Sequence, residues 1–235
     1  MSEESQNLHL EFVDEGLRLV SEAEKRGIQL RILGSIAYRI QCPKNLHLFD
    51  DMARVLTDVD FAGLKSQNQE IREFLIGEGY VPDEGVYVAS EGTRHIYLHP
   101  ESNLNVDVFA DELYFCHRIP FEGRLDIDMP TISTTDLLLE KMQIVEINLK
   151  DFKDTLVLML EHPLGSPADG NKHIDVRYIC DMMSHDWGFY HTFTTNLKRV
   201  PEHIQEFPAI SEDEGNVIRT HIQDLLDAIE ATPKS

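Results

Sequence analysis

The spacing of apolar residues in the first half of the chain changes repeatedly between a helical and a strand-like period. Apolar positions recur every three or four residues over 3–26, which predicts an amphipathic helix that ends at Gly27. Apolar and polar residues alternate over part of 28–33 and again over 58–61, which predicts strands. The remaining predicted elements are a helix from Ile36 to about Cys42, a helix over 66–78, strands at Val86–Ala89, His95–Leu98 and Leu104–Phe109, and two short stretches at Leu113–Cys116 and Phe121–Leu125 that extend the sheet.

After Pro130 the pattern becomes helical and stays so to the end of the chain. Several possible N-cap residues follow that proline, and the last predicted helix carries an apolar stripe on one face. We therefore predict an α/β or α+β domain over 1–130 and a helical domain over 131–235. The expected helices of the second half are 134–147, 150–161, 172–184, 186–199 and 214–230.

Composition and charge narrow the classes of function. The 235 residues include 21 Lys+Arg and 42 Asp+Glu, a formal net charge of −21, which disfavours non-specific binding to nucleic acid or to anionic membranes. The apolar runs are shorter than the ~20 residues that a membrane span needs. The three cysteines are far apart and not in metal-binding spacing, so we expect a reducing, cytoplasmic environment.

Asp58 and Asp60 are separated by one apolar residue on a predicted strand. Because side chains alternate between the faces of a strand, both carboxylates project to the same side. Two anions held side by side repel each other unless a cation lies between them, and Mg²⁺ prefers one or two carboxylates together with water and phosphates. The alternative interpretation is an exposed acidic strand end, which is common in so acidic a chain.

A second alternating strand, 105–109, presents one further carboxylate, Asp107. If this strand pairs beside the first, three carboxylates converge, and three such oxygen donors can hold two cations roughly 3.5–4 Å apart. The alternative is a solvent-facing Asp on an edge strand.

Gly34 and Ser35 stand between a predicted strand and the start of a predicted helix. Exposed backbone N–H groups and the helix dipole at such a position favour a phosphate group. The same dipeptide also serves as an ordinary turn with a helix cap. Because the dipeptide precedes two predicted strands that carry carboxylates, its position in the chain favours the phosphate-binding interpretation.

The order Gly34-Ser35, Asp58-x-Asp60 and Asp107 resembles the polymerase-β-type nucleotidyltransferase superfamily, and within it the minimal and abortive-infection-type nucleotidyltransferases. The stretch from Asp136 to Lys141, followed by Lys150-Asp151-x-x-Asp154, is similar to their Asp-Leu…Lys…Arg-Asp-x-x-Asp segment. The resemblance covers about 28–160, with 42–57 as an insertion.

The resemblance implies a mixed sheet flanked by helices, so that 1–130 is a nucleotidyltransferase-like catalytic domain. It also implies Asp58 and Asp60 as Mg²⁺ ligands, Asp107 as the third ligand and the base, and Gly34 and Ser35 at the triphosphate of a bound nucleotide.

Lys141 lies within or beside the apolar stripe of its predicted helix, where a desolvated ammonium needs an anion. That anion is either a nucleotide phosphate or a structural partner such as Asp151 or Asp154, unless the side chain extends its charge to solvent. Arg39, one turn after Ser35, is a second candidate for the nucleotide phosphates, and Arg54 is a third.

Together these features predict an enzyme that binds two Mg²⁺ ions. It transfers a nucleoside monophosphate from an NTP to an acceptor hydroxyl and releases pyrophosphate. The acceptor is a small molecule, a tRNA or a protein, the last two being the toxin-type alternative. Another alternative is an inactive nucleotide-binding or regulatory protein of the same fold.

Overall fold

The computed structural model describes residues 3–234 and has a mixed α/β architecture, which confirms the predicted class. The chain groups into two compact units, each described separately below. The first comprises Met1–Ala37, Val55–Tyr114 and Arg118–Ile132, and the second comprises Tyr38–Arg54, Phe115–His117 and Ser133–Ser235. The segments 38–54 and 115–117, which the sequence analysis placed in the first domain, thus group with the C-terminal helices.

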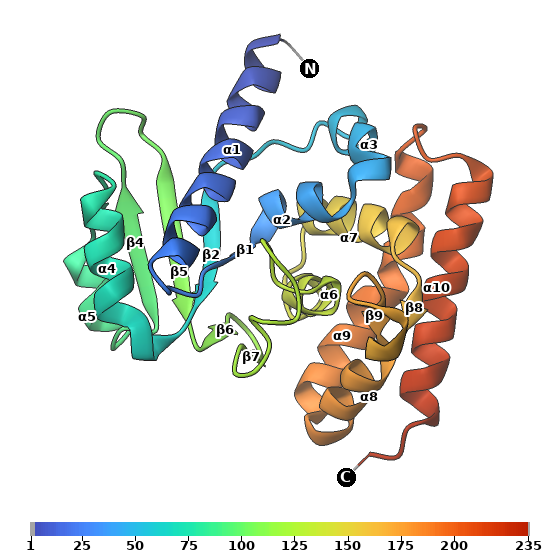
Figure 1. Cartoon of the computed structure of the whole chain (residues 1–235). Helices are drawn as coiled ribbons and strands as arrows, with labels where there is room; N and C mark the ends of the chain where they lie inside the picture. Colours follow the sequence, from blue (N-terminus) through green and yellow to red (C-terminus); the bar gives the residue numbers. More distant parts are fainter. Residues whose placement is uncertain (1–2, 235) are drawn as a thin grey trace. The chain divides into compact units, whose positions relative to one another are not determined.

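A five-stranded mixed sheet organises the first unit (Figure 1). Its inner strands β2 and β5 run parallel, and every other neighbouring pair is antiparallel. The extended chain after Pro130 adds to the edge at β1, where the Ile32 N–H donates to the Pro130 carbonyl at 2.9 Å. The strand order is β1 (Arg31–Leu33), β2 (Val59–Gly63), β5 (Asn105–Ala110), β4 (Arg94–Leu98) and β3 (Val81–Pro82).

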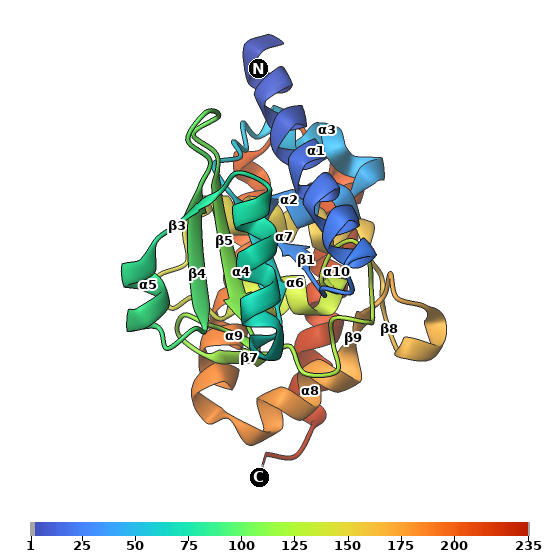
Figure 2. The same cartoon turned by 60° about the vertical axis from the view of Figure 1, so that its left-hand side comes forward.

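Helices α1 (Glu3–Lys25) and α4 (Asn68–Gly77) cover one face of this sheet (Figure 2). A Cβ placed on Gly16 of α1 would lie 3.3 Å from Ile32, and one on Gly63 of β2 would lie 3.1 Å from Ile71 of α4. The apolar residues of β2 and β5 that project to this face are fully buried: Val59, Phe61, Val106 and Val108. The core of the unit therefore lies on this face.

Two of the predicted strand segments, Val86–Ala89 and Phe121–Leu125, are wrong, and a third, Leu113–Cys116, overlaps a strand that does not extend the main sheet. Val86–Ala89 belongs to helix α5 (Glu84–Ala89), because the Asp83 carboxylate accepts the N–H groups of Gly85 and Val86 and so caps a helix there. The stretch after Ala110 forms a separate two-stranded sheet, β6 (Glu112–Tyr114) with β7 (Arg118–Pro120), and does not extend the main sheet. The segment 121–125 is a turn following β7.

Helix α2 (Gly34–Gln41) directly follows β1 and begins two residues earlier than predicted. Gly34, its first residue, has a φ of +69°, a conformation that glycine adopts without steric cost. The boundary between the two units falls inside this helix, after Ala37.

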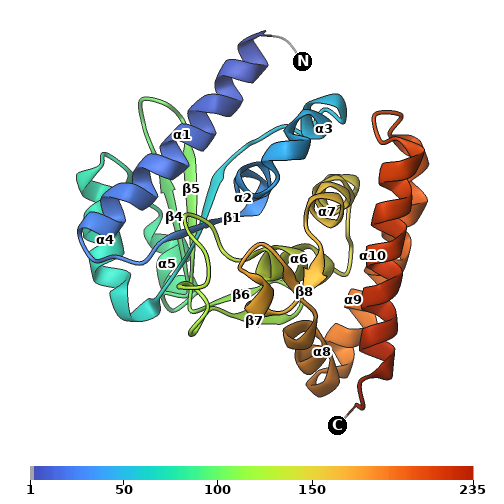
Figure 3. The same ribbon diagram turned by 45° about the vertical axis from the view of Figure 1, so that its right-hand side comes forward.

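The second unit is helical. Its last helix, α10, packs against α7, α8 and α9 (Figure 3) through a stripe that includes Ile218, Ile222 and Leu225, as the sequence pattern predicted. Short strands β8 (Leu164–Gly165) and β9 (Ile174–Asp175) pair between α7 and α8. The other elements are η1 (Pro43–Asn45), α3 (Leu46–Asp51), α6 (Thr134–Met142), α7 (Leu149–Glu161), η3 (Pro167–Asp169), α8 (Val176–His185), α9 (Trp187–Arg199), η4 (Val200–Glu206) and α10 (Glu212–Ala231); η2 (Lys65–Gln67) lies in the first unit.

Among the helices of residues 3–234, none is both long and apolar enough to cross a membrane. Cys42, Cys116 and Cys180 are all free thiols.

Candidate active site

The parallel pairing of β2 with β5 brings Asp60 and Asp107 together. They are direct Cα partners in the ladder, between the paired positions Val59–Val106 and Phe61–Val108. Since the valines and the phenylalanine are buried on the face covered by α1 and α4, the two carboxylates project from the opposite face. The prediction that Asp107 lies beside the Asp58–Asp60 pair on one layer of the sheet is confirmed for Asp60.

Asp58 lies immediately before β2, which begins one residue later than predicted. The Thr57 hydroxyl donates to Asp58 Oδ1 at 2.9 Å. Asp58 is close enough to Asp107 for its negative charge to raise the pKa of the Asp107 carboxyl. All three predicted carboxylates therefore belong to the same part of the first unit.

Asp60 also lies against the start of α2. Leu33, the last residue of β1, is the Cα partner of Asp60, so that Gly34 comes next to the Asp60 side chain. A Cβ on Gly34 would overlap Oδ2 of Asp60 and stand 3.2 Å from its Cγ. Ser35 follows in the first turn of α2 and is buried, and this turn contains no acidic residue. The predicted Gly34-Ser35 turn therefore lies next to the carboxylate of Asp60.

Asp107 has a cationic partner that the sequence analysis did not identify. Arg94, on the neighbouring strand β4, donates from Nε to both carboxylate oxygens at 3.1 and 3.0 Å, and its terminal nitrogen also donates to Oδ2. Burial raises the pKa of Asp107, the hydrogen bonds from Arg94 oppose that shift, and Asp58 adds to it, so that the pKa is raised overall.

The carboxylates of this face are the side chains that could hold Mg²⁺. Within residues 3–234, the side chains as they stand form no group of three or more His, Cys, Asp or Glu that could hold a metal ion. At this face, Asp107 accepts hydrogen bonds from Arg94 through both of its carboxylate oxygens. Asp58 and Asp60 still offer two carboxylates, the number that Mg²⁺ uses together with water and substrate phosphates.

Lys141, Arg39 and Arg54, the three predicted candidates for contact with the phosphates, belong to the second unit. Lys141 on α6 is buried, with Nζ 3.1 Å from Glu140, 3.4 Å from Asp151 and 3.5 Å from Asp154. Burial lowers the pKa of Lys141, but these carboxylates outweigh it and raise the pKa overall. The structure therefore gives Lys141 the ion pairs of the structural alternative, and its contact with a phosphate stays a prediction.

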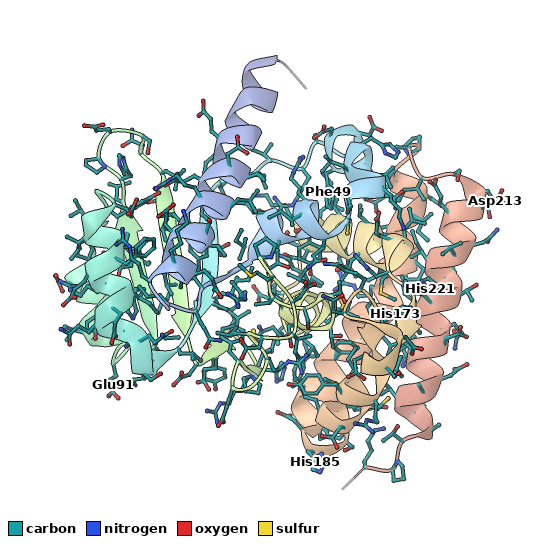
Figure 4. All side chains as sticks on the ribbon, in the orientation of Figure 1. Phe49, Glu91, His173, His185, Asp213 and His221 are labelled. Carbon is teal, nitrogen blue, oxygen red and sulfur yellow. The ribbon has the colours of Figure 1, made fainter. Side chains whose placement is uncertain are left out.

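Arg39 also has structural partners in this unit. It donates to Asp50 Oδ1 at 3.0 Å and to the Arg54 carbonyl at 2.9 Å, and it lies over the ring of Phe49, labelled in Figure 4. Arg54 in turn donates to both oxygens of the fully buried Asp154, at 2.8 and 2.9 Å. The segment 38–54 is thus tied to α7 by buried charges.

Comparisons of the chain with protein-family models, with curated proteins and with solved structures found no match.

Proposed function

We propose that the chain is a Mg²⁺-dependent nucleotidyltransferase of the polymerase-β type, which moves a nucleoside monophosphate from an NTP to an acceptor hydroxyl. The observation that carries the proposal is the pairing of Asp60 with Asp107 in adjacent parallel strands, with Asp58 two residues before Asp60. The close approach of Gly34 to Asp60 supports it further, since it sets a helix N-terminus beside the carboxylates.

Each residue of this face has a role in the proposed reaction. Asp58 and Asp60 would hold the Mg²⁺, which neutralises negative charge on the nucleotide phosphates when it is bound. The N–H groups at the start of α2, at Gly34 and Ser35, would orient the triphosphate. The absence of a side chain at Gly34 leaves space for the Asp60 carboxylate.

Asp107 would act as the base. Its carboxylate accepts the proton of the acceptor hydroxyl, whose oxygen forms a bond to the α-phosphorus. The bond from the α-phosphorus to the bridging oxygen breaks, and pyrophosphate leaves with that electron pair. A carboxyl whose pKa is raised by burial holds the accepted proton more firmly than an exposed one, which favours this role.

The test is release of pyrophosphate from each labelled NTP in the presence of Mg²⁺ and a cell extract as the source of acceptor. Asp58→Ala and Asp60→Ala should each abolish the release while the melting temperature stays near that of the wild type. Glu70→Ala, which removes an exposed carboxylate on α4, is the matched control and should keep full activity. Turnover retained in both aspartate variants would remove these residues from the mechanism.

The second candidate is a nucleotide-binding or regulatory protein of the same fold that does not catalyse nucleotidyl transfer. The ion pair between Arg94 and Asp107 favours this candidate, because the carboxylate of Asp107, the proposed base, is already bound to the Arg94 guanidinium. Calorimetry that detects NTP binding, with no pyrophosphate released over many acceptors, would support this candidate. Label found on a tRNA or a protein would instead identify the toxin-type enzyme, which differs in its acceptor and not in its chemistry.

A further inference from the structure

Arg94 is held in place by more than its ion pair. It is the Cα partner of Phe109 in the antiparallel ladder of β4 with β5, two residues along the strand from Asp107. Its guanidinium carbon lies 5.3 Å from the centre of the Phe109 ring, within the range of a cation–π interaction. The strand register, the cation–π contact with Phe109 and the ion pair with Asp107 therefore hold the positive charge of Arg94 on the face that carries the carboxylates.

The two partners differ in exposure. The Asp107 side chain is 14% exposed, whereas that of Arg94 is 43% exposed. Arg94 is therefore the more solvent-accessible partner of the pair. Asp60 also contributes to this environment, because its negative charge raises the pKa of Arg94.

We propose that Arg94 replaces the second divalent cation at this site, so that the nucleotide complex holds a single divalent ion, on Asp58 and Asp60. This inference rests on the proposed function. A divalent ion that bridged to Asp107 would have to share a carboxylate whose two oxygens already accept from the guanidinium, and it would be repelled by that positive charge at close range. Arg94 is thus a positioning residue that acts through Asp107.

The test counts divalent ions and does not depend on turnover. Mn²⁺ bound to the wild-type chain in the presence of an NTP analogue with a methylene bridge between its α- and β-phosphorus is measured by electron paramagnetic resonance. We expect a single Mn²⁺ per complex in the wild type and a second Mn²⁺ in Arg94→Gln. Arg94→Lys keeps the positive charge at this position and therefore perturbs folding less than Arg94→Gln does. We expect this variant to bind a single Mn²⁺.

Arg72→Gln provides the matched control. Arg72 also pairs with a carboxylate, that of Glu84, and lies 5.8 Å from the centre of an aromatic ring, that of Tyr87, but it belongs to α4. Its replacement should leave the count at a single ion.

Two Mn²⁺ ions in the wild type, or an unchanged count in Arg94→Gln, would overturn the inference and leave the proposed function standing. If neither the wild type nor Arg94→Gln retained any Mn²⁺ with the analogue, the proposed function would fail together with the inference.

Discussion

Gly34 and Asp60 lie so close together that any larger residue at position 34 would displace the Asp60 carboxylate. A Cβ there would stand 3.3 Å from the Asp60 Cβ and overlap the carboxylate oxygen Oδ2. The positive φ of Gly34 adds a conformational reason for glycine, since L-residues adopt that region at a cost. A single glycine therefore sets both the start of α2 and the position of one predicted ligand.

Gly34→Ala should weaken divalent-ion binding strongly, because the new methyl group forces the Asp60 carboxylate away from its position. We expect Mn²⁺ affinity to fall by at least tenfold, the order of loss seen when the surroundings of a metal ligand are disturbed. A titration of Mn²⁺ followed by electron paramagnetic resonance measures it.

Gly27→Ala separates this contact from backbone strain. Gly27 has a φ of +73°, close to that of Gly34, but a Cβ there would meet nothing within 4 Å. Both variants should lose a similar stability, about 1–3 kcal/mol for an unfavourable backbone conformation. Equal Mn²⁺ affinity in the two variants would mean that the contact with Asp60 has no influence on the site.

The buried pair of Arg54 with Asp154 should dominate the stability of the second unit. Arg54→Met leaves a fully buried carboxylate with one cation fewer, and we expect it to lower the free energy of unfolding by about 3–5 kcal/mol. Urea denaturation measures this change. Arg219→Met, which breaks an exposed pair with Glu212, serves as the control and should change stability by no more than about 0.5 kcal/mol.

A double-mutant cycle with Asp154→Leu distinguishes the pair from the remaining packing. Because the double variant no longer buries an orphaned charge in this pair, its loss should be smaller than the sum of the single losses by about 0.5–3 kcal/mol. Strict additivity would show that Arg54 and Asp154 do not stabilise the unit through each other.

His95 should make stability depend on pH. Burial lowers its pKa below the ordinary value of 6.5, a backbone hydrogen bond with Gly92 opposes the shift, and the charge of Arg72 adds to it. The unfolded chain therefore binds the proton more readily, so the stabilisation is complete above about pH 6.5 and is lost as the pH falls through the lower pKa of the folded state.

His95→Phe should accordingly flatten the dependence of the unfolding free energy on pH between about 7.5 and 5. The measurement is urea denaturation over that range of pH. An equally steep dependence in His95→Phe would contradict the prediction.

The sequence pattern predicted the main elements where the apolar period is long and uniform. The strands that carry Asp60 and Asp107 alternate clearly, and α10 has a continuous apolar stripe. Val86–Ala89 resembles a strand because it is a run of β-branched and aromatic residues, whereas the signal for a helix is the capping carboxylate of Asp83, three residues before Val86.

The candidate site was predictable as far as it depends on strand alternation, and less so where it depends on strand pairing. Alternation put Asp58 and Asp60 on one face, but the partner of Asp107 follows from the register of β4 with β5, which is set by the turn between them. Arg94 was therefore missed. The lysine at 141 was found from its position among apolar residues, but burial alone does not tell a structural carboxylate from a phosphate.

The most direct test of the central claim is the anomalous diffraction of Mn²⁺ in crystals of the chain with the methylene-bridged NTP analogue. The account predicts a peak within about 2.0–2.6 Å of carboxylate oxygens of both Asp58 and Asp60, with the phosphates of the analogue at the start of α2. An ordered nucleotide whose Mn²⁺ touches neither carboxylate would contradict it.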